Sequence, residues 1–167
     1  QKDYAPVFNP SLAVGGGSPI DFFDPFGLSK EVDEETFKLW QEAETKHSRV
    51  AMLAFVGLVV GEVLSGSAPL FNGSITGPAI FHFQQADAIM PSFWVGVTTI
   101  IAWIEGNTII ENWQTWDETA KDPLGRAKLA KTTIPGDLKF DPLGLKPKDA
   151  KSYASMKTKE LNNGRLA

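Results

Sequence analysis

The chain has 167 residues, of which 43% are hydrophobic and 22% are charged, and it carries a formal net charge of -4 with no cysteine. Without a block of Lys and Arg, it lacks the clustered cations that bind a phosphate backbone, so nucleic acid is not an expected partner. The lack of cysteine excludes disulfides, iron–sulfur clusters, zinc–thiolate sites and thiol nucleophiles.

The predicted elements begin with an irregular arm and a long helix. Residues 1–30 are rich in Gly, Pro, Ser and Asn and favour turns over a helix. The chain begins at Gln1 without a charged and apolar leader, so we expect that a targeting peptide has been removed. From about 32 to 65 a charged stretch runs into an apolar one, which predicts a helix that crosses a bilayer with its charged end in water.

Two further helices are expected. A span at about 91–113 follows a loop rich in Pro and Gly, and Trp94 and Trp113 near its ends suit the two membrane interfaces. The third helix is expected at about 147–167, where the chain stops as the apolar half begins, so we interpret it as truncated. The fold class is therefore an all-α membrane protein with three transmembrane helices. Core helices of a soluble bundle are the alternative, because the spans are short and not free of charge.

An internal repeat organises the chain. Residues 23–28 read F-D-P-F-G-L and residues 140–145 read F-D-P-L-G-L, and each turn leads into E-x-x-[H/N]-x-R-x-A, at 44–51 and at 160–167. A repeat of this kind predicts two similar helices. We expect the first and third helices to cross and to be related by a pseudo-two-fold axis.

The charges of the repeat need partners. Glu44 and His47 share a helix face because residues three apart are separated by about 60°, whereas Arg49 points away from Glu44. In a low-dielectric surrounding an unpaired ion is costly, so each must be neutralised from elsewhere. The repeat predicts two interhelix ion pairs, Glu44 with Arg165 and Glu160 with Arg49.

The same residues are candidate metal ligands. A glutamate neutralised by arginine keeps a lone pair, and His47 or Asn163 offers a neutral donor. In a chlorin ring four nitrogens hold the magnesium and leave one axial position, so one side chain per metal is enough. The candidate metal is therefore the magnesium of chlorophyll. Glu105, in the apolar second span, is a candidate by the same argument, with a helix-end or water-facing role as the alternative.

Two other groups of residues carry weaker signals. Gly57 and Gly61 form a G-x-x-x-G pattern, which is expected to let the crossing helices approach closely. His82, Gln84 and Gln85 lie before the second span. Loop hydrogen bonding is expected for them, and Gln84 is kept as a candidate ligand.

With these motifs in place, the chain resembles the light-harvesting chlorophyll-binding superfamily over nearly its whole length. The resemblance rests on E-x-x-H-x-R-x-A-M at 44–52 and E-x-x-N-G-R-x-A at 160–167, each after an F-D-P-x-G-L turn. It implies one antenna domain, 1–167, that binds chlorophyll a, with chlorophyll c as a candidate second pigment, and carotenoids near the two turns. The implied chlorophyll ligands are Glu44, His47, Glu105, Glu160 and Asn163, and the implied ion-pairing residues are Arg49 and Arg165.

The resemblance also implies a place and a role. It places the chain in the plastid thylakoid membrane, among thylakoid lipids and neighbouring antenna subunits, where it passes excitation energy to a photosystem core, with photosystem I preferred over photosystem II. The loops resemble red-lineage antennae more than green-plant ones. Two alternatives stay open, a photoprotective relative that quenches excitation and a membrane scaffold without pigments.

An enzyme is not expected. E-x-x-H on a helix is half of a di-iron carboxylate pattern, which needs a second E-x-x-H on a facing helix. The second copy of the repeat carries Asn163 at the place where that pattern needs histidine.

Overall fold

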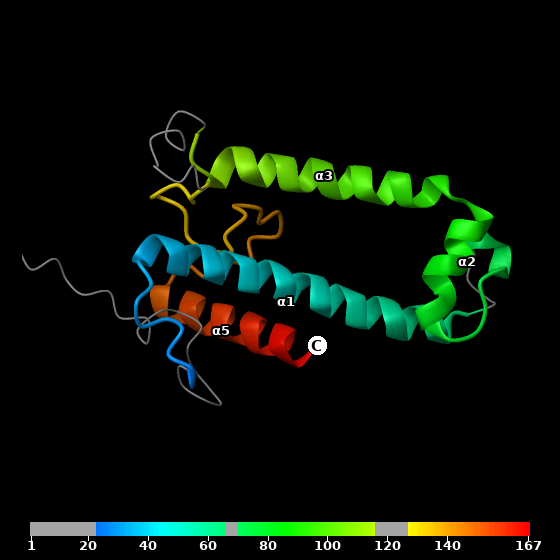
Figure 1. Ribbon diagram of the computed structural model, residues 1–167, viewed down its shortest axis with the longest axis horizontal. Coiled ribbons are helices and arrows are strands. Elements are labelled where there is room, and N and C mark those ends of the chain that lie inside the picture. The colour runs from blue at the N-terminus through cyan, green and yellow to red at the C-terminus, as the bar shows by residue number, and fades with distance from the viewer. Residues whose placement is uncertain (1–22, 66–69, 116–126) are drawn as a thin grey trace, which may run out of the picture. The chain divides into compact units, whose positions relative to one another are not determined.

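The computed structural model describes residues 23–65, 70–115 and 127–167, so most of the arm expected at 1–30 lies outside the described residues. The described chain is helical (Figure 1). Its α-helices are α1 (Glu34–Val63), α2 (His82–Ile89), α3 (Ser92–Asn112) and α5 (Ala150–Leu166), and the 3₁₀ helices η2 (Leu70–Gly73) and η3 (Ala79–Phe81) lie between α1 and α2. An isolated β-bridge joins Trp113 to Leu129.

The chain divides into two compact units. One comprises Gln1–Arg49 with Asn112–Ala167, and the other comprises Val50–Glu111. The first unit contains the charged half of α1 together with α5, and the second contains the apolar half of α1, α2 and nearly all of α3. Both F-D-P-x-G-L turns and the four residues of the two expected ion pairs therefore belong to the same unit.

α1 and α5 begin with the same kind of cap. The Asp33 carboxylate accepts hydrogen bonds from the backbone N–H and the hydroxyl of Thr36, at 3.2 and 2.7 Å. The Asp149 carboxylate accepts the same two bonds from Ser152, at 3.0 and 3.1 Å. A capping carboxylate satisfies an N–H that lacks a partner in the first helical turn, so both copies fix the start of their helix by the same interaction.

The first F-D-P-x-G-L turn folds around its aspartate. The Asp24 carboxylate accepts hydrogen bonds from the backbone N–H groups of Leu28 and Ser29, each at 2.9 Å, and from the Ser29 hydroxyl at 2.6 Å. Gly27 has a φ of 67°, in the left-handed region that residues with a Cβ rarely adopt. These bonds, with the Ser29 hydroxyl first, hold the pKa of Asp24 below its ordinary value of 3.8.

The second turn repeats this geometry. The Asp141 carboxylate accepts hydrogen bonds from the backbone N–H groups of Leu145 and Lys146, each at 2.9 Å, and Gly144 has a φ of 65°. The bond from Lys146, followed by the one from Leu145, lowers the pKa of Asp141 below 3.8. The glycine and aspartate of the repeat are therefore explained by the turn itself.

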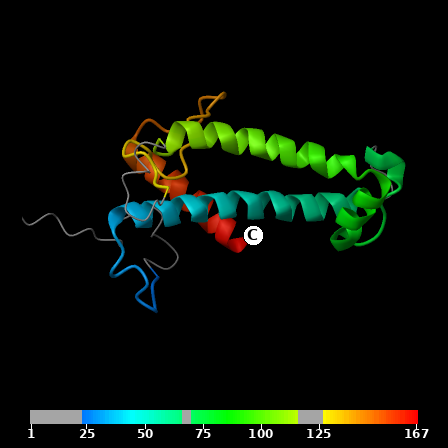
Figure 2. The same ribbon diagram turned by 45° about the horizontal axis from the view of Figure 1, so that its top comes forward.

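In the first unit α5 crosses the charged half of α1 (Figures 1 and 2). Gly164 of α5 is buried against Ser48 of α1, where a Cβ added to the glycine would lie 2.1 Å from the Ser48 Cβ and 2.6 Å from its Cα. Thr45 and Leu161, which also correspond in the repeat, are buried three positions before Ser48 and Gly164 on the two helices. Corresponding residues of the two helices thus meet where the helices cross.

The close approach predicted at Gly57 and Gly61 is wrong for the described residues. A Cβ on Gly57 would meet nothing within 4 Å, and one on Gly61 would meet the His82 ring at 3.3 Å. The crossing lies earlier on α1, where the repeat places its charges, so Ser48 and Gly164 make the contact instead.

The second unit contains a helix where the sequence suggested a loop. α2 begins at His82 and contains Phe83 and Ala86. The Phe83 ring stacks on Trp94 of α3 at a centroid distance of 4.3 Å, and Ala86 is only 4% exposed. This packing favours a helix, because it places Phe83 and Ala86, three positions apart, on one face.

Buried side chains are mainly polar in the described part of the chain, and many large apolar ones are exposed. Glu42, Thr45, Ser48 and Lys157 are buried, whereas Ile110 of α3 is 83% exposed. Large exposed apolar surfaces mark contact with lipid or another apolar partner.

α3 alone among the described helices is long and apolar enough to cross a membrane. The mean hydropathy of its most apolar 18-residue window is 1.3, and only 6% of that window is buried. Charged residues are spread along the first half of α1 and along α5, so the described structure supports one of the three expected spans.

We predict that Gly164→Ala destabilises the fold by about 1–3 kcal/mol, because the new methyl group overlaps Ser48 and forces the helices apart. Gly57→Ala is the matched control, since its methyl group meets nothing within 4 Å. Thermal unfolding in detergent, followed by circular dichroism, compares them. Equal stability of the two variants would contradict a crossing at Gly164.

We also predict that acid loosens the two turns. A carboxylate whose pKa is lowered by folding stabilises the fold above its unfolded pKa and loses this effect as the pH falls through its folded pKa. For Asp24 and Asp141 the unfolded reference is 3.8, so their effect is complete at neutral pH and declines below about pH 4. Asp141→Asn should therefore flatten the decline of the melting temperature between pH 5 and 3, and an unchanged slope would refute this account.

Candidate functional site

Two ion pairs join α1 to α5. The Arg49 Nε donates to Glu160 Oε1 at 2.7 Å. Arg165 donates to Glu44 Oε1 from Nε at 2.8 Å and from Nη2 at 2.7 Å. These are the partners expected from the repeat, and each arginine neutralises the glutamate of the other helix.

Each glutamate uses one oxygen for its arginine. Oε1 receives the arginine in both pairs, and among the described residues no hydrogen bond reaches Oε2 of Glu44 or of Glu160. The side chains of Glu44 and Glu160 are 40% and 30% exposed. Each carboxylate can therefore offer a lone pair to one hard metal without adding net charge to the crossing.

His47 presents a defined tautomer. Its Nδ1 lies 2.7 Å from the Ala43 carbonyl oxygen, which only accepts hydrogen bonds, so Nδ1 carries the proton. Nε2 then keeps its lone pair on an exposed ring. In metal sites, a hydrogen bond from the ring nitrogen that does not bind the metal commonly orients a ligating histidine. Asn163 is exposed at the corresponding place on α5.

Arg49 also fixes a loop that the sequence did not single out. Its Nη2 donates to the Gly136 carbonyl at 2.6 Å, while the Gly136 N–H donates to Glu42 Oε2 at 2.5 Å. Gly136 has a φ of 82°, and a Cβ there would lie 2.9 Å from Thr45. In the sequence, Pro135 followed by Gly136 is a turn signal that could have identified this loop.

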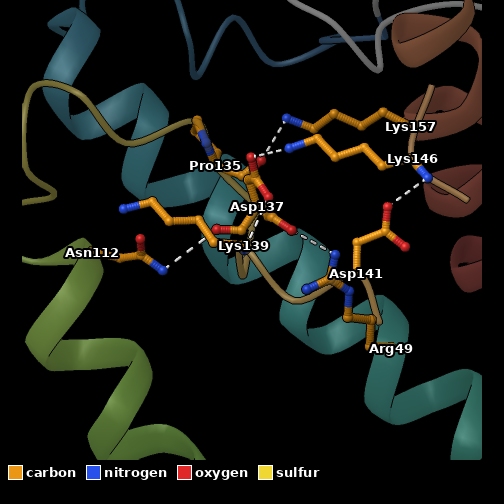
Figure 3. A network of polar contacts seen from close by, with 9 residues as sticks. Arg49, Asn112, Pro135, Asp137, Lys139, Asp141, Lys146 and Lys157 are labelled. Atoms are coloured by element: carbon orange, nitrogen blue, oxygen red, sulfur yellow. Dashed lines mark hydrogen bonds and ion pairs between the residues drawn. The ribbon is translucent and has the colours of Figure 1, made fainter. Parts of the chain in front are cut away.

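The same loop is tied to α5 and to the end of α3 (Figure 3). Lys157 Nζ donates to the Pro135 carbonyl at 2.7 Å, and Asn112 Nδ2 lies 3.5 Å from the Asp137 carbonyl. Lys146 pairs with the Asp137 carboxylate. Burial raises the pKa of Asp137, but the hydrogen bonds from the Lys146 side chain and the Lys139 N–H, together with the charges of both lysines, outweigh it and leave the pKa below 3.8.

A cavity of about 630 Å³ lies beside this loop. Its lining includes Glu160, Met156 and Tyr153 of α5 and Phe140 and Leu145 of the second turn. One of the proposed ligand carboxylates thus borders a hollow with an apolar wall, which is the usual character of a small-molecule site.

The remaining candidates lie in the second unit. Glu105 is partly buried on α3, and Gln84 is exposed on α2. Gln85 exchanges two hydrogen bonds with the backbone of Thr76, each at 2.9 Å, and His82 Nε2 lies 2.9 Å from the Gly77 carbonyl. His82 and Gln85 therefore make the loop hydrogen bonds expected from the sequence.

We predict that Arg49 matters more for stability than Arg165. Arg49→Gln removes two charged hydrogen bonds from a side chain that is 30% exposed and should cost about 2–3 kcal/mol. Arg165→Gln, at 46% exposed, should cost about 1 kcal/mol. Urea unfolding in detergent measures both, with the exposed Lys159→Gln as control. A larger loss for Arg165→Gln would contradict the role of the Gly136 contact.

Most of the chain matches a known protein family. Residues 11–167 match the family described as chlorophyll A-B binding protein. The chain is 42% identical to light-harvesting complex stress-related protein 1 of Chlamydomonas reinhardtii over 174 residues, which cover 99% of the chain and 66% of that protein. It is 41% identical to a fucoxanthin-chlorophyll a-c binding protein of Isochrysis galbana, over 98% of the chain and 78% of that protein.

Similarity to a green-plant antenna is lower. The chain is 32% identical to chlorophyll a-b binding protein 7 of Solanum lycopersicum, over 97% of the chain and 59% of that protein. The chain spans 54% to 66% of the length of the stress-related relatives it matches. Because the match covers both copies of the repeat and nearly the whole sequence, the chain belongs to the chlorophyll a-b binding protein family.

Proposed function

We propose that the chain is a light-harvesting antenna subunit that binds chlorophylls and carotenoids and passes excitation energy to a photosystem. The observation that supports this most directly is the neutralised pair of glutamates at the helix crossing, each with an oxygen left over. Chlorophyll, when bound, supplies the absorption and transfer of light energy. The chain makes and breaks no bond in this role and is not proposed to be an enzyme.

The donor set fits chlorophyll. Glu44 and Glu160 each offer Oε2 beside an arginine, His47 offers Nε2, and Asn163 offers a neutral amide. Each of these side chains can act as a single ligand. One ligand is enough for a magnesium that the chlorin ring already holds through four nitrogens. Glu105 and Gln84 are proposed as further ligands on α3 and α2.

The proposed setting is the plastid thylakoid membrane. Several relatives are described as chloroplastic. We propose three spans, in which α1 and α3 cross the membrane and α5, as the second copy of the repeat, enters it as α1 does. Neighbouring antenna subunits and a photosystem core, with photosystem I preferred, are the proposed partners. The relative that binds chlorophylls a and c supports chlorophyll c beside chlorophyll a.

Energy dissipation is the second candidate function. The chain is 42% to 44% identical to relatives whose names mark them as stress-related, and a light-harvesting protein under stress has excess excitation to remove. The fluorescence lifetime of the pigment-loaded chain decides between the two. A strongly shortened lifetime favours quenching, and a long one favours transfer.

We predict that His47→Leu loses one chlorophyll per chain, because leucine has no lone pair for the magnesium. His47→Asn should keep that chlorophyll, since the second copy of the repeat carries asparagine at the corresponding place. Pigments extracted from the refolded proteins and separated by chromatography give the stoichiometry. Lys159→Leu, an exposed change on α5, is the control. The same chlorophyll content in all four proteins would exclude His47 as a ligand.

A further inference from the structure

One peptide group, between Pro135 and Gly136, is bonded to a buried ion on each of two helices. Its N–H donates to Glu42 Oε2 of α1 at 2.5 Å. Its C=O accepts from Lys157 Nζ of α5 at 2.7 Å (Figure 3). Glu42 and Lys157 are only 4% and 7% exposed. Because a buried ion needs hydrogen bonds and an opposite charge, this peptide links two side chains that have to be held in place.

The next peptide group connects these two ions to an ion pair of the crossing. The Gly136 C=O accepts from Arg49 Nη2 at 2.6 Å, while Arg49 Nε donates to Glu160 Oε1 at 2.7 Å. On α5, Lys157 and Glu160 are three positions apart and share a face. On α1, Glu42 and Arg49 are seven positions apart and also share a face. Two anions and two cations therefore surround the loop, and their charges sum to zero.

The second ion pair cannot be supported in this way. By the register of the repeat, Lys157 corresponds to Gln41, and Glu42 corresponds to Thr158. The pair on Glu44 consequently lacks both of these charges at the corresponding places. The two ligand carboxylates are thus alike in their arginines and differ in the residues behind the arginines.

The loop also borders the space next to Glu160. The cavity of about 630 Å³ is lined by Pro135, Gly136, Arg49 and Lys157 together with Glu160. The peptide held by the two buried ions is therefore part of the wall beside this ligand carboxylate.

We propose that Glu42 and Lys157 are positioning residues for the chlorophyll on Glu160. They hold the loop peptide from both sides, and the loop holds Arg49. Arg49 then occupies Oε1 of Glu160 and leaves Oε2 available to magnesium. In metal sites, residues that orient a ligand without touching the metal are worth about 10- to 100-fold in metal affinity. The inference rests on the proposed pigment binding and adds to it the residues that orient one ligand.

The test compares variants of the full chain refolded with chlorophyll and carotenoid. Lys157→Met keeps a long apolar side chain but removes the ammonium, so it should weaken the retention of one chlorophyll about tenfold. Lys157→Arg keeps a charged donor and should restore that retention. Lys159→Met, an exposed change on the same helix, is the matched control and should leave it unchanged. Chlorophyll per chain is measured across a dilution series in detergent.

Absorption difference spectra identify the chlorophyll that is affected. The double variant Glu160→Leu with Arg49→Leu removes the ligand without leaving an unpaired charge, and its difference spectrum marks the chlorophyll on Glu160. The spectrum of His47→Leu marks the chlorophyll on His47. We expect the spectrum of Lys157→Met to match the first and to differ from the second. Hydrogen exchange at the Gly136 amide should also become faster in Lys157→Met, which reports on the loop independently of pigment.

The outcomes separate the inference from the proposed function. Unchanged retention in Lys157→Met overturns the inference and leaves pigment binding intact. An equal proportional loss of every chlorophyll, which indicates a role in folding alone, or a match to the His47→Leu spectrum does the same. An unmodified chain that retains no chlorophyll overturns the proposed function as well. If Lys157→Met does not refold, Glu42→Gln, which keeps an acceptor but removes the charge, must produce the selective loss instead.

Discussion

Four charged side chains are neutralised at the crossing of α1 and α5, because each is paired with an opposite charge on the other helix. Glu44 with Arg165 and Glu160 with Arg49 are held at 2.7–2.8 Å, and none of the four could be removed without leaving a charge behind. Because the four side chains are 30% to 46% exposed, water lowers the cost of such an orphaned charge to about 1–3 kcal/mol. The crossing is therefore specified by two features. The ion pairs set which residues face each other, and the packing of Gly164 against Ser48 allows the close approach of the helices.

The burial pattern of the described chain indicates that lipid or pigment, and not protein, covers its apolar side chains. Polar side chains such as Glu42, Thr45 and Lys157 lie inside the first unit, while the outward faces of α1 and α3 are apolar and exposed. In water this arrangement would be unfavourable, because the hydrophobic effect acts on the exposed area. Lipid and pigment together can cover such faces, and a pigment ligand on such a face needs only one lone pair. This links the distribution of apolar residues to the proposed light-harvesting role.

The two copies of the repeat share their backbone interactions and differ in what surrounds them. Caps, turns and ion pairs correspond, down to φ values of 67° and 65° at the turn glycines. Among the described residues, however, only Arg49 also donates a hydrogen bond to a loop carbonyl, that of Gly136. The pair on Glu160 is consequently tied to the Gly136 loop beside a cavity, whereas the pair on Glu44 is more exposed.

The sequence by itself determined the helical class, the repeat, the ion-pair partners and the family. These follow from local periodicity and from charge balance, because Glu44 and Arg49 on one helix cannot neutralise each other and the second copy supplies a matching set. It also indicated His47 as a ligand type, but not its tautomer, which depends on the Ala43 carbonyl.

Tertiary structure decided where the helices touch and which polar groups lack partners. The G-x-x-x-G pattern was misleading, because small residues permit a close approach without specifying it, and the charges set the crossing at Ser48 and Gly164. α2 and the buried Trp94 N–H depend on packing between separate helices, such as Phe83 of α2 on Trp94 of α3, which the periodicity within one helix does not record. Local periodicity fixes which face a residue occupies, and only the folded chain fixes what that face meets.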